Sequence, residues 1–477
     1  SIMIIRQWLK LPDYSYRKAG LGHRATERPL YFYMKHKILV LDVYPKVKYR
    51  ISKDLNGGYG TGNDYGDSWF SKLLKLFVKN SINFPPLYSV QVCGELVALG
   101  HELEFKKNIS SNDINNYDLI IMPSSIVCHE TEIEFVKKLS KINKVLVIGP
   151  FGSANPNNYL KNGAAVLKGE PENFFHKINL TKFLENFKIE LIENSKIVPL
   201  DDFEIPGWET IFKDYTPVMK FLGKGPAINL YASKGCPYSC FYYCVYPAQQ
   251  GRKLRLKSPK KVLEEMVYFY DKLKVRNYIF RDPVFSLDKR HTKLLCEEII
   301  KSKKNFNIAV ETHLKNIDDE LADIFLKSGI KLIYVGIESA DESVRESAKR
   351  WSDNNDVQLK KINYLEKIGI KIKAMYIIGF PEDTEEKYLK TIEYANKVNS
   401  IYAQFSVFTP YPGTPVYEEY KDKLLTNKFE NFNQWQLVFK HKNLNEISIR
   451  KLLDLSYKKY YLRYSWIKKY FLNRFFK

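Results

Sequence analysis

The chain has 477 residues, of which 45% are hydrophobic, so it has material for two or three globular domains and is not a disordered protein. Its sequence holds no apolar stretch near the roughly 20 residues that a membrane-spanning helix needs, and its N-terminus lacks the features of a secretory signal. Six cysteines without an extracellular pairing pattern suit a reducing compartment, so we expect a cytoplasmic protein.

The formal net charge of +21 raises the question of a polyanionic partner, because clustered lysines and arginines release counterions from nucleic acids and acidic membranes. In this chain the basic residues are spread along the whole sequence, and Lys, Asn, Ile and Tyr are all abundant. A compositional bias explains this pattern better than a binding face does. The sequence therefore argues against a nucleic-acid partner.

The first third of the chain predicts a doubly wound domain. We expect residues 1–34 to be an N-terminal extension, because Met34 opens MKHKILVLD, which is typical of the natural start of a first strand. Over residues 35–177 near-continuous apolar runs alternate with helical patterns, as in a parallel sheet that is covered on both faces. The apolar runs lie at 37–43, 118–123, 144–150 and 164–170.

Ligands of doubly wound sheets bind beyond the carboxyl ends of the strands. Small residues at those ends let a large cofactor approach the backbone. The candidate cofactor-binding residues there are Ser124, Ser125, Gly149, Gly152, Gly169 and Glu170. The glycine-rich segment 56–66 also suits a close-approach loop, although it is not a nucleotide-binding fingerprint.

Residues 178–222 are predicted to connect this domain to a second series of strands and helices. Six strands with helices between them predict an open or partial (β/α) barrel over residues 223–415, with its chemistry at the carboxyl ends of the strands. The predicted strands lie at 227–233, 277–282, 308–314, 332–339, 373–380 and 403–410.

Three cysteines, Cys236, Cys240 and Cys244, follow the first of these strands in the run GCPYSCFYYCVYP. Free cysteines are common in cores, but a cluster this dense in a reducing compartment more often binds metal or acts in redox chemistry. Zinc would usually take a fourth Cys or His nearby, and no histidine lies inside or just beside this run. The pattern favours an iron–sulfur cluster with one iron left open for a substrate.

This segment resembles the cluster loop of the radical S-adenosylmethionine (radical SAM) enzymes, in which three cysteines hold a 4Fe–4S cluster and the open iron chelates S-adenosylmethionine. One residue is inserted here, because three residues rather than two separate Cys240 from Cys244. Tyr243 keeps the aromatic residue that precedes the last cysteine. The resemblance implies that the three cysteines are catalytic metal ligands, and it leaves open whether the insertion displaces Cys244.

Other strand ends of the second series match the same family. The resemblance implies that Asp282 meets the amino group of S-adenosylmethionine, and that Glu311 places an acid in the barrel mouth. Glu338 and Ser339 stand in a GIES motif that lies near the ribose and carboxylate, and Gly379 stands in a GFP turn that accommodates the adenine. The segment YPGTP at 411–415 is similar to one that closes many of these barrels.

The first domain looks like the cobalamin-binding domain that precedes many radical SAM enzymes, with a closing GExE at 169–172. Its histidines do not stand in the DxHxxG motif of proteins that ligate cobalt through histidine, so the resemblance implies cobalamin without a histidine ligand on its lower face. A doubly wound domain that binds another small ligand, or none, stays open.

Residues 416–477 are predicted to be a helical C-terminal extension that ends in SYKKYYLRYSWIKKYFLNRFFK. Such a basic and aromatic tail can dock on a membrane surface, but more often it packs its rings on the protein and solvates its charges. We expect packing, and peripheral membrane contact is the alternative.

The resemblance as a whole implies an α/β protein in which a Rossmann-like cobalamin-binding domain precedes a partial (β/α)6, TIM-like radical SAM barrel. It resembles the class B methyltransferases, which use a 5'-deoxyadenosyl radical and methylcobalamin to methylate an unactivated carbon, or more rarely phosphorus. It implies three cofactors, namely a 4Fe–4S cluster, S-adenosylmethionine and cobalamin. The partners implied are a small-molecule or lipid-like substrate and an external electron donor of the flavodoxin or ferredoxin type.

Three alternatives remain open on the sequence. One is a radical SAM enzyme that cyclises or rearranges its substrate without methyl transfer. Another is an RNA-modifying methylthiotransferase, although such proteins carry a second cysteine triplet where this chain offers only Cys93 and Cys128. The third is a non-catalytic cobalamin-binding protein whose cluster loop has decayed.

Overall fold

The structure is a computed structural model that describes residues 34–79, 84–212, 215 and 222–475. The predicted N-terminal extension therefore lies outside the described residues, except for Met34. Residues 35–477 form one compact unit. Among the described residues, no helix has both the length and the apolar character needed to cross a membrane.

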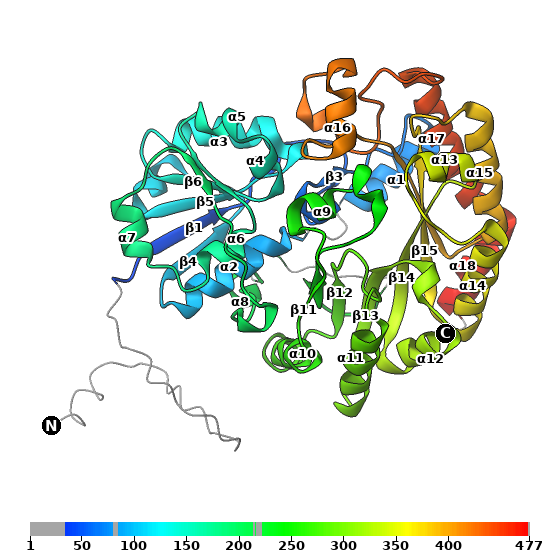
Figure 1. The fold of residues 1–477 in the computed structure, drawn as a ribbon, viewed down its shortest axis with the longest axis horizontal. Coiled ribbons are helices and arrows are strands. Elements are labelled where there is room, and N and C mark those ends of the chain that lie inside the picture. The colour runs from blue at the N-terminus through cyan, green and yellow to red at the C-terminus, as the bar shows by residue number, and fades with distance from the viewer. Residues whose placement is uncertain (1–33, 80–83, 213–214, 216–221, 476–477) are drawn as a thin grey trace. The chain divides into compact units, whose positions relative to one another are not determined.

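The first sheet has six strands in the order β4-β1-β5-β6-β7-β8, and every neighbouring pair is parallel (Figure 1). Its central strands are the apolar runs that the sequence predicts. The strands are β1 (Lys37–Leu41), β4 (Glu102–Lys106), β5 (Leu119–Pro123), β6 (Val145–Ile148), β7 (Ala165–Lys168) and β8 (Leu191–Glu193).

Both faces of this sheet are buried, because alternate residues of its strands enter two different cores. Val40 and Ile121 belong to the core that also holds α2, whereas Leu39 and Ile120 belong to the core that holds α3. The predicted α/β arrangement, a parallel sheet covered on both faces, is confirmed. The first core is covered by α2 (Leu87–Ala98), α6 (Pro171–Phe175), α7 (Leu180–Glu185) and α8 (Trp208–Ile211), and the second by α3 (His129–Leu139), α4 (Pro150–Ala154) and α5 (Pro156–Leu160).

The two edge strands, β4 and β8, were not predicted. Both are at least partly exposed, so neither shows the continuous apolar run of a strand that is buried on two faces. Strand β8 lies inside the segment 178–222 that was predicted to be a connection, and it pairs with β7. The first sheet therefore extends beyond residue 177.

The second sheet has six parallel strands in sequential order, β9-β12-β13-β14-β15-β16. A helical crossover joins each strand to the next, and all six predicted strands are present. The strands are β9 (Ala227–Leu230), β12 (Asn277–Phe280), β13 (Asn307–Thr312), β14 (Ile330–Glu338), β15 (Lys371–Ile378) and β16 (Tyr402–Val407). The helices are α10 (Pro259–Leu273), α11 (Lys289–Lys301), α12 (Asp319–Ser328), α13 (Glu342–Ser347), α14 (Asn355–Ile368) and α15 (Glu385–Val398).

The segment after β1 reaches across to the second sheet. It contains the short hairpin of β2 (Ile51–Ser52) and β3 (Thr61–Gly62). Between these strands Asp54 forms a buried ion pair of 2.5 Å with Arg281, which follows β12. Thr61 donates a hydrogen bond of 2.7 Å to the carbonyl of Asn433. Sequence-distant segments thus meet where both sheets present their strand ends.

The C-terminal region packs its aromatic residues against the second sheet, as expected. In α17 (Glu446–Tyr461) the hydroxyls of Tyr457 and Tyr461 donate to the carbonyls of Phe405 and Ala403 on the edge strand β16. The region is not continuously α-helical, because a stretch that buries Trp435 and holds only two short 3₁₀ turns separates α16 (Pro415–Tyr420) from α17. A last helix, α18 (Tyr464–Phe475), follows α17.

Candidate functional site

The three cysteines of the second sheet line one cavity of about 200 Å³ at the carboxyl ends of its strands. Cys236 and Cys240 are buried, and Cys244 is partly exposed. A short 3₁₀ turn at residues 239–242 folds the loop back, so that the amide of Cys244 donates to the carbonyl of Cys240 at 3.0 Å. The predicted ligands are therefore brought together.

The turn also accommodates the inserted residue. Phe241 lies under the guanidinium of Arg252, 4.5 Å from the ring centroid, and the Tyr242 hydroxyl donates to Glu419. Tyr243 packs edge-on against Phe380 and lines the cavity. Of the three residues between Cys240 and Cys244, only Tyr243 lines the cavity.

The surroundings shift the pKa values of the Cys240 and Cys244 thiols in opposite directions. A hydrogen bond with the Cys244 thiol lowers the pKa of Cys240 to about 6 against the opposing effect of burial, and the charge of Arg350 lowers it further. The same hydrogen bond, together with burial, raises the pKa of Cys244. The lowered pKa of Cys240 favours its thiolate, which is the form in which cysteine binds metals.

No group of three His, Cys, Asp or Glu side chains among the described residues is arranged around a single metal ion. An iron–sulfur cluster needs a different arrangement, since each iron that the protein ligates takes its own thiolate. Three cysteines that line one cavity, one of them with a lowered pKa, fit that donor set.

Two predicted acids, Glu311 and Glu338, line the same cavity. Burial raises the pKa of Glu311 to about 7, and burial also raises that of Glu338 against the charge of Arg350. Arg350 lies 3.6 Å from Glu338 and donates a hydrogen bond to the carbonyl of Gly336. The cavity therefore presents both acidic groups and a cation beside the thiols.

Three other predicted residues of this half do not line the cavity. Asp282 is buried beneath it and accepts hydrogen bonds from the Ala232 amide and, at 2.5 Å, from the Ser233 hydroxyl. Ser339 accepts from the amide of Asp341, and Gly379 adopts a φ of 76° against Ile449. The contacts of these residues are with neighbouring parts of the chain rather than with the cavity.

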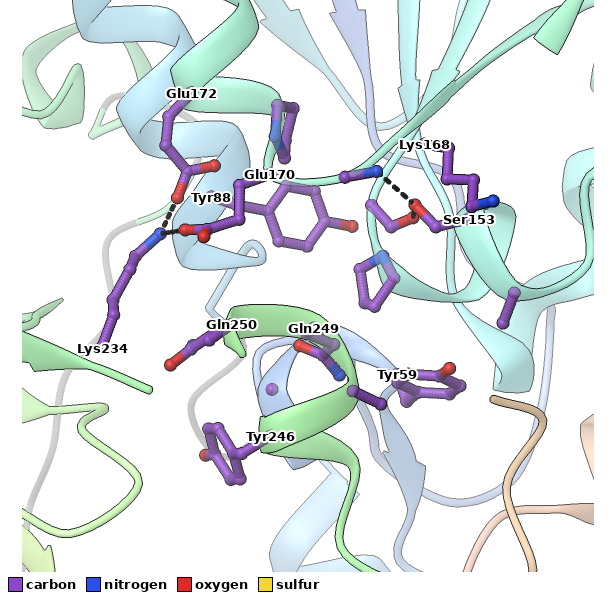
Figure 2. A pocket seen from close by; sticks show the side chains of 18 of the residues that line it. Tyr59, Tyr88, Ser153, Lys168, Glu170, Glu172, Lys234, Tyr246, Gln249 and Gln250 are labelled. Carbon is purple, nitrogen blue, oxygen red and sulfur yellow. Dashed lines mark hydrogen bonds and ion pairs between the residues drawn. The ribbon is translucent and has the colours of Figure 1, made fainter. Parts of the chain in front are cut away.

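A second cavity, of about 470 Å³, lies at the carboxyl ends of the first sheet (Figure 2). The predicted residues Gly149, Gly169 and Glu170 line it. Both glycines have positive φ, and an added Cβ would overlap the Tyr88 hydroxyl at Gly149 or lie 2.5 Å from the Asn194 carbonyl at Gly169. Neighbouring residues of the chain itself approach the backbone of both glycines, and the approach of a cofactor there stays a prediction.

Charged residues from both halves meet on one wall of this cavity. Lys234 forms ion pairs with Glu170, at 2.8 Å, and with Glu172, as Figure 2 shows. Arg255 pairs with the other oxygen of Glu170 at 2.5 Å. No histidine is among the described residues that line the cavity.

The predicted residues Ser124, Ser125 and Gly152 lie behind the wall. Ser124 accepts from the Gly152 amide and donates to the Ile148 carbonyl, both at 2.8 Å. The Ser125 hydroxyl donates to the carbonyl of Tyr59, which lines the cavity. These residues shape the loops that form the cavity without facing it.

Tyr246 lines both cavities, and no sequence motif marked it. It belongs to α9 (Val245–Gln250), which begins directly after Cys244 and turns Gln249 and Gln250 toward the larger cavity (Figure 2). Burial raises the pKa of Tyr246 far above its ordinary value. Tyr88 and Arg350 were also missed, because only the fold brings them to the cavities.

Comparison with known proteins agrees with this geometry. Residues 230–395, which include the cysteine loop, match the model of the Radical SAM superfamily. This part of the chain is a radical SAM domain. It contains β12 to β15 in full, the last residue of β9 and all three cysteines.

Relatives of the chain extend beyond the radical SAM domain. An uncharacterized methyltransferase of Pyrococcus horikoshii is 28% identical over 55% of this chain, and the match spans 57% of that relative's length. The bacteriochlorophyllide d C-12(1)-methyltransferase of Chlorobaculum tepidum is 24% identical over 70% of this chain and 72% of its own.

Among solved structures, the radical SAM methyltransferase TsrM of Kitasatospora setae, with cobalamin and a [4Fe-4S] cluster bound, is similar to this chain. The TM-score is 0.57 at 14% identity, over 81% of this chain and 75% of that one. This likeness shows that the two chains share a fold across both sheets.

Proposed function

We propose that this protein is a cobalamin-dependent radical SAM methyltransferase that acts on an unactivated carbon. One observation carries the proposal: a cavity walled by three cysteines adjoins a glycine-lined cavity, and the two share Tyr246. The names of the relatives support methyl transfer, since they include methyltransferases.

The two halves take different cofactors in this proposal. Residues 35–177, extended by β8, form the cobalamin-binding domain, and residues 223–415 form a partial (β/α)6 barrel that binds S-adenosylmethionine. The sequential order of the second sheet supports the barrel, and the positive-φ glycines of the larger cavity support the approach of a bulky ligand to the backbone. The cobalamin and cluster bound in TsrM support the same assignment.

When bound, the cluster with S-adenosylmethionine supplies a radical that removes a hydrogen atom from the substrate, and methylcobalamin supplies the methyl group. Cys236, Cys240 and Cys244 hold the cluster. Glu338 and Arg350 lie beside them and offer opposite charges to the ammonium and carboxylate of S-adenosylmethionine. Asp282, Ser339 and Gly379 position the strand ends rather than contact the ligand.

The partners follow from this chemistry. We assign a small-molecule or lipid-like substrate to the junction of the cavities at Tyr246. We also assign an external one-electron donor of the flavodoxin or ferredoxin type, because the cluster has to be reduced before S-adenosylmethionine can be cleaved.

Anaerobic reconstitution with iron and sulfide tests the cluster. We expect about four irons per chain, absorbance in the iron–sulfur band and cleavage of S-adenosylmethionine to 5'-deoxyadenosine on reduction. Each of Cys236→Ala, Cys240→Ala and Cys244→Ala should abolish that cleavage, whereas Cys296→Ala, at a buried cysteine of α11, should retain it. Cleavage that survives in all three variants would refute the radical mechanism.

Isotope labelling separates methyl transfer from other radical outcomes. With S-adenosylmethionine that carries a deuterated methyl group, a methyltransferase passes the label to its product and a cyclase does not. Product that forms without the label would replace methyl transfer with cyclisation or rearrangement and would leave the cluster assignment standing.

A further inference from the structure

Helix α1 (Trp69–Lys79) exposes a continuous apolar stripe. The exposed fractions are 64% for Trp69, 40% for Leu73, 69% for Leu76 and 75% for Phe77. These residues are spaced i, i+4, i+7 and i+8, so they fall within an arc of about 100° on one side of the helix. A soluble surface normally exposes large apolar residues singly rather than in such a row.

The side of α1 that adjoins this stripe is already occupied by the protein. Phe70 and Ser71 are buried, and the Ser71 hydroxyl donates to Asp454 of α17 at 2.5 Å. The amide of Ser68, which precedes the helix, also donates to Asp454. These contacts fix the rotation of α1, and that rotation leaves Trp69, Leu76 and Phe77 pointing away from the core.

Lysines border the exposed stripe. Lys72 and Lys79 are exposed, Lys75 forms an ion pair with Asp64, and α1 contains no acidic residue. On a helical wheel the three lysines lie together, on the flank of the stripe that is away from the buried side. An apolar stripe that carries a tryptophan and is edged by lysines matches the boundary of an anionic bilayer, where the rings enter the headgroup region and the ammonium groups face lipid phosphates.

We propose that α1 is a membrane-surface helix that docks the protein on anionic lipid. Its 11 residues lie in the plane of the interface and do not cross the bilayer. This surface is separate from both cavities, because none of the residues that line them belongs to α1. It also differs from the C-terminal tail, whose aromatic residues in α17 are committed to β16.

Vesicle flotation of the full chain tests the proposal. We expect the protein to float with vesicles of phosphatidylcholine and phosphatidylglycerol, and to float much less with phosphatidylcholine alone or at high salt. The double variant Leu76→Ser, Phe77→Ser should lower the partition coefficient at least about tenfold, and Lys72→Gln should lower it about fivefold.

The matched control is Ile142→Ser, Ile189→Ser, which removes two exposed apolar side chains from other surfaces. It should float like the parent, and circular dichroism should show that all variants are folded. Hydrogen exchange of residues 69–79 should slow when anionic vesicles are added. Equal flotation of the parent and the α1 double variant, no flotation of the parent, or a concentration-dependent dimer that only the α1 variant loses would each overturn the proposal.

Discussion

At the residue scale, the structure divides the predicted site residues into those that face the cavities and those that support them. Cys236, Cys240, Cys244, Glu311 and Glu338 face the smaller cavity, and Gly149, Gly169 and Glu170 face the larger one. The other predicted residues line neither cavity, namely Ser124, Ser125, Gly152, Asp282, Ser339 and Gly379. A motif at a strand end thus marks the site, but the side chain that meets the ligand has to be found from the geometry.

The substitution Gly149→Ala tests whether the backbone at this position has to stay free of a side chain for cobalamin to bind. The φ of 104° at Gly149 is strained for any residue with a Cβ, and that Cβ would overlap Tyr88. We expect Gly149→Ala to lower the free energy of unfolding by about 2–3 kcal/mol and to weaken cobalamin binding at least about tenfold. Chemical denaturation and equilibrium titration with cobalamin measure the two effects.

Gly100→Ala is the matched control, because Gly100 has a φ of 87° and its added Cβ would meet nothing within 4 Å. It should cost only the backbone strain, about 1 kcal/mol, and leave cobalamin binding unchanged. Equal effects of both substitutions would show that the contact with Tyr88 does not matter.

The buried carboxyl group of Asp282 is expected to make the free energy of unfolding depend on pH. Burial raises its pKa to about 6, above the roughly 3.9 of an unfolded aspartate, so the folded protein holds this proton more tightly. Its contribution to the free energy of unfolding is therefore complete below about pH 4 and is lost as the pH rises through 6, a change of about 3 kcal/mol. Denaturation of Asp282→Asn from pH 4 to 7 should lack this fall, and curves that stay parallel to those of the parent would contradict the assignment.

At the scale of elements, an ion cluster ties the strand ends of the first sheet together. Lys53 is fully buried and lies 3.0 Å from Asp42, after β1, and 2.9 Å from Glu132 in α3. Burial opposes its charge, but the two carboxylates outweigh burial and hold the pKa of Lys53 well above its ordinary value. The hairpin that carries Lys53 is thereby anchored to the sheet on one side and to Arg281 on the other.

Lys53→Met should lower the free energy of unfolding by about 3–5 kcal/mol, because it leaves two buried carboxylates without a cation. Lys301→Met removes an exposed pair with Glu298 in α11 and should cost less than about 1 kcal/mol. Urea denaturation at neutral pH compares the variants. A loss of less than 1 kcal/mol in Lys53→Met would mean that the cluster is not an anchor.

At the scale of the whole molecule, the two sheets share one core. Trp208 of α8 is fully buried, packs against α2 and β4 of the first half, and donates a hydrogen bond of 3.0 Å to the carbonyl of Asn229 in β9. Core residues from both sheets belong to one continuous cluster that includes Trp208. The halves are therefore expected to unfold together.

Trp208→Ala should lower the free energy of unfolding by about 3–5 kcal/mol and weaken both sheets. Hydrogen exchange should accelerate in β5 and in β14 alike, whereas Trp351→Ala, at an exposed tryptophan, should change neither. Acceleration confined to one of the two strands would show that the halves are stabilised independently.

The sequence predicts those parts of the molecule that are set by local pattern. Strands buried on two faces appear as apolar runs, so β1, β5 to β7 and the whole second sheet are foreseen, whereas the edge strands β4 and β8 are partly exposed and are missed. The cysteines stand in one short run. Arg350, by contrast, joins them from a loop 110 residues after Cys240, with no periodicity that would announce it.

The position of α9 has a thermodynamic consequence for the order in which the protein is loaded. This helix starts one residue after Cys244, and its far end walls the larger cavity. Any displacement of α9 that accompanies ligation at Cys244 also alters the affinity of the neighbouring chamber, and linkage requires the reverse effect to be equal in size. The affinity for the iron–sulfur cluster, measured with and without the corrinoid cobalamin, should therefore change by the same factor as the affinity for cobalamin measured with and without the cluster.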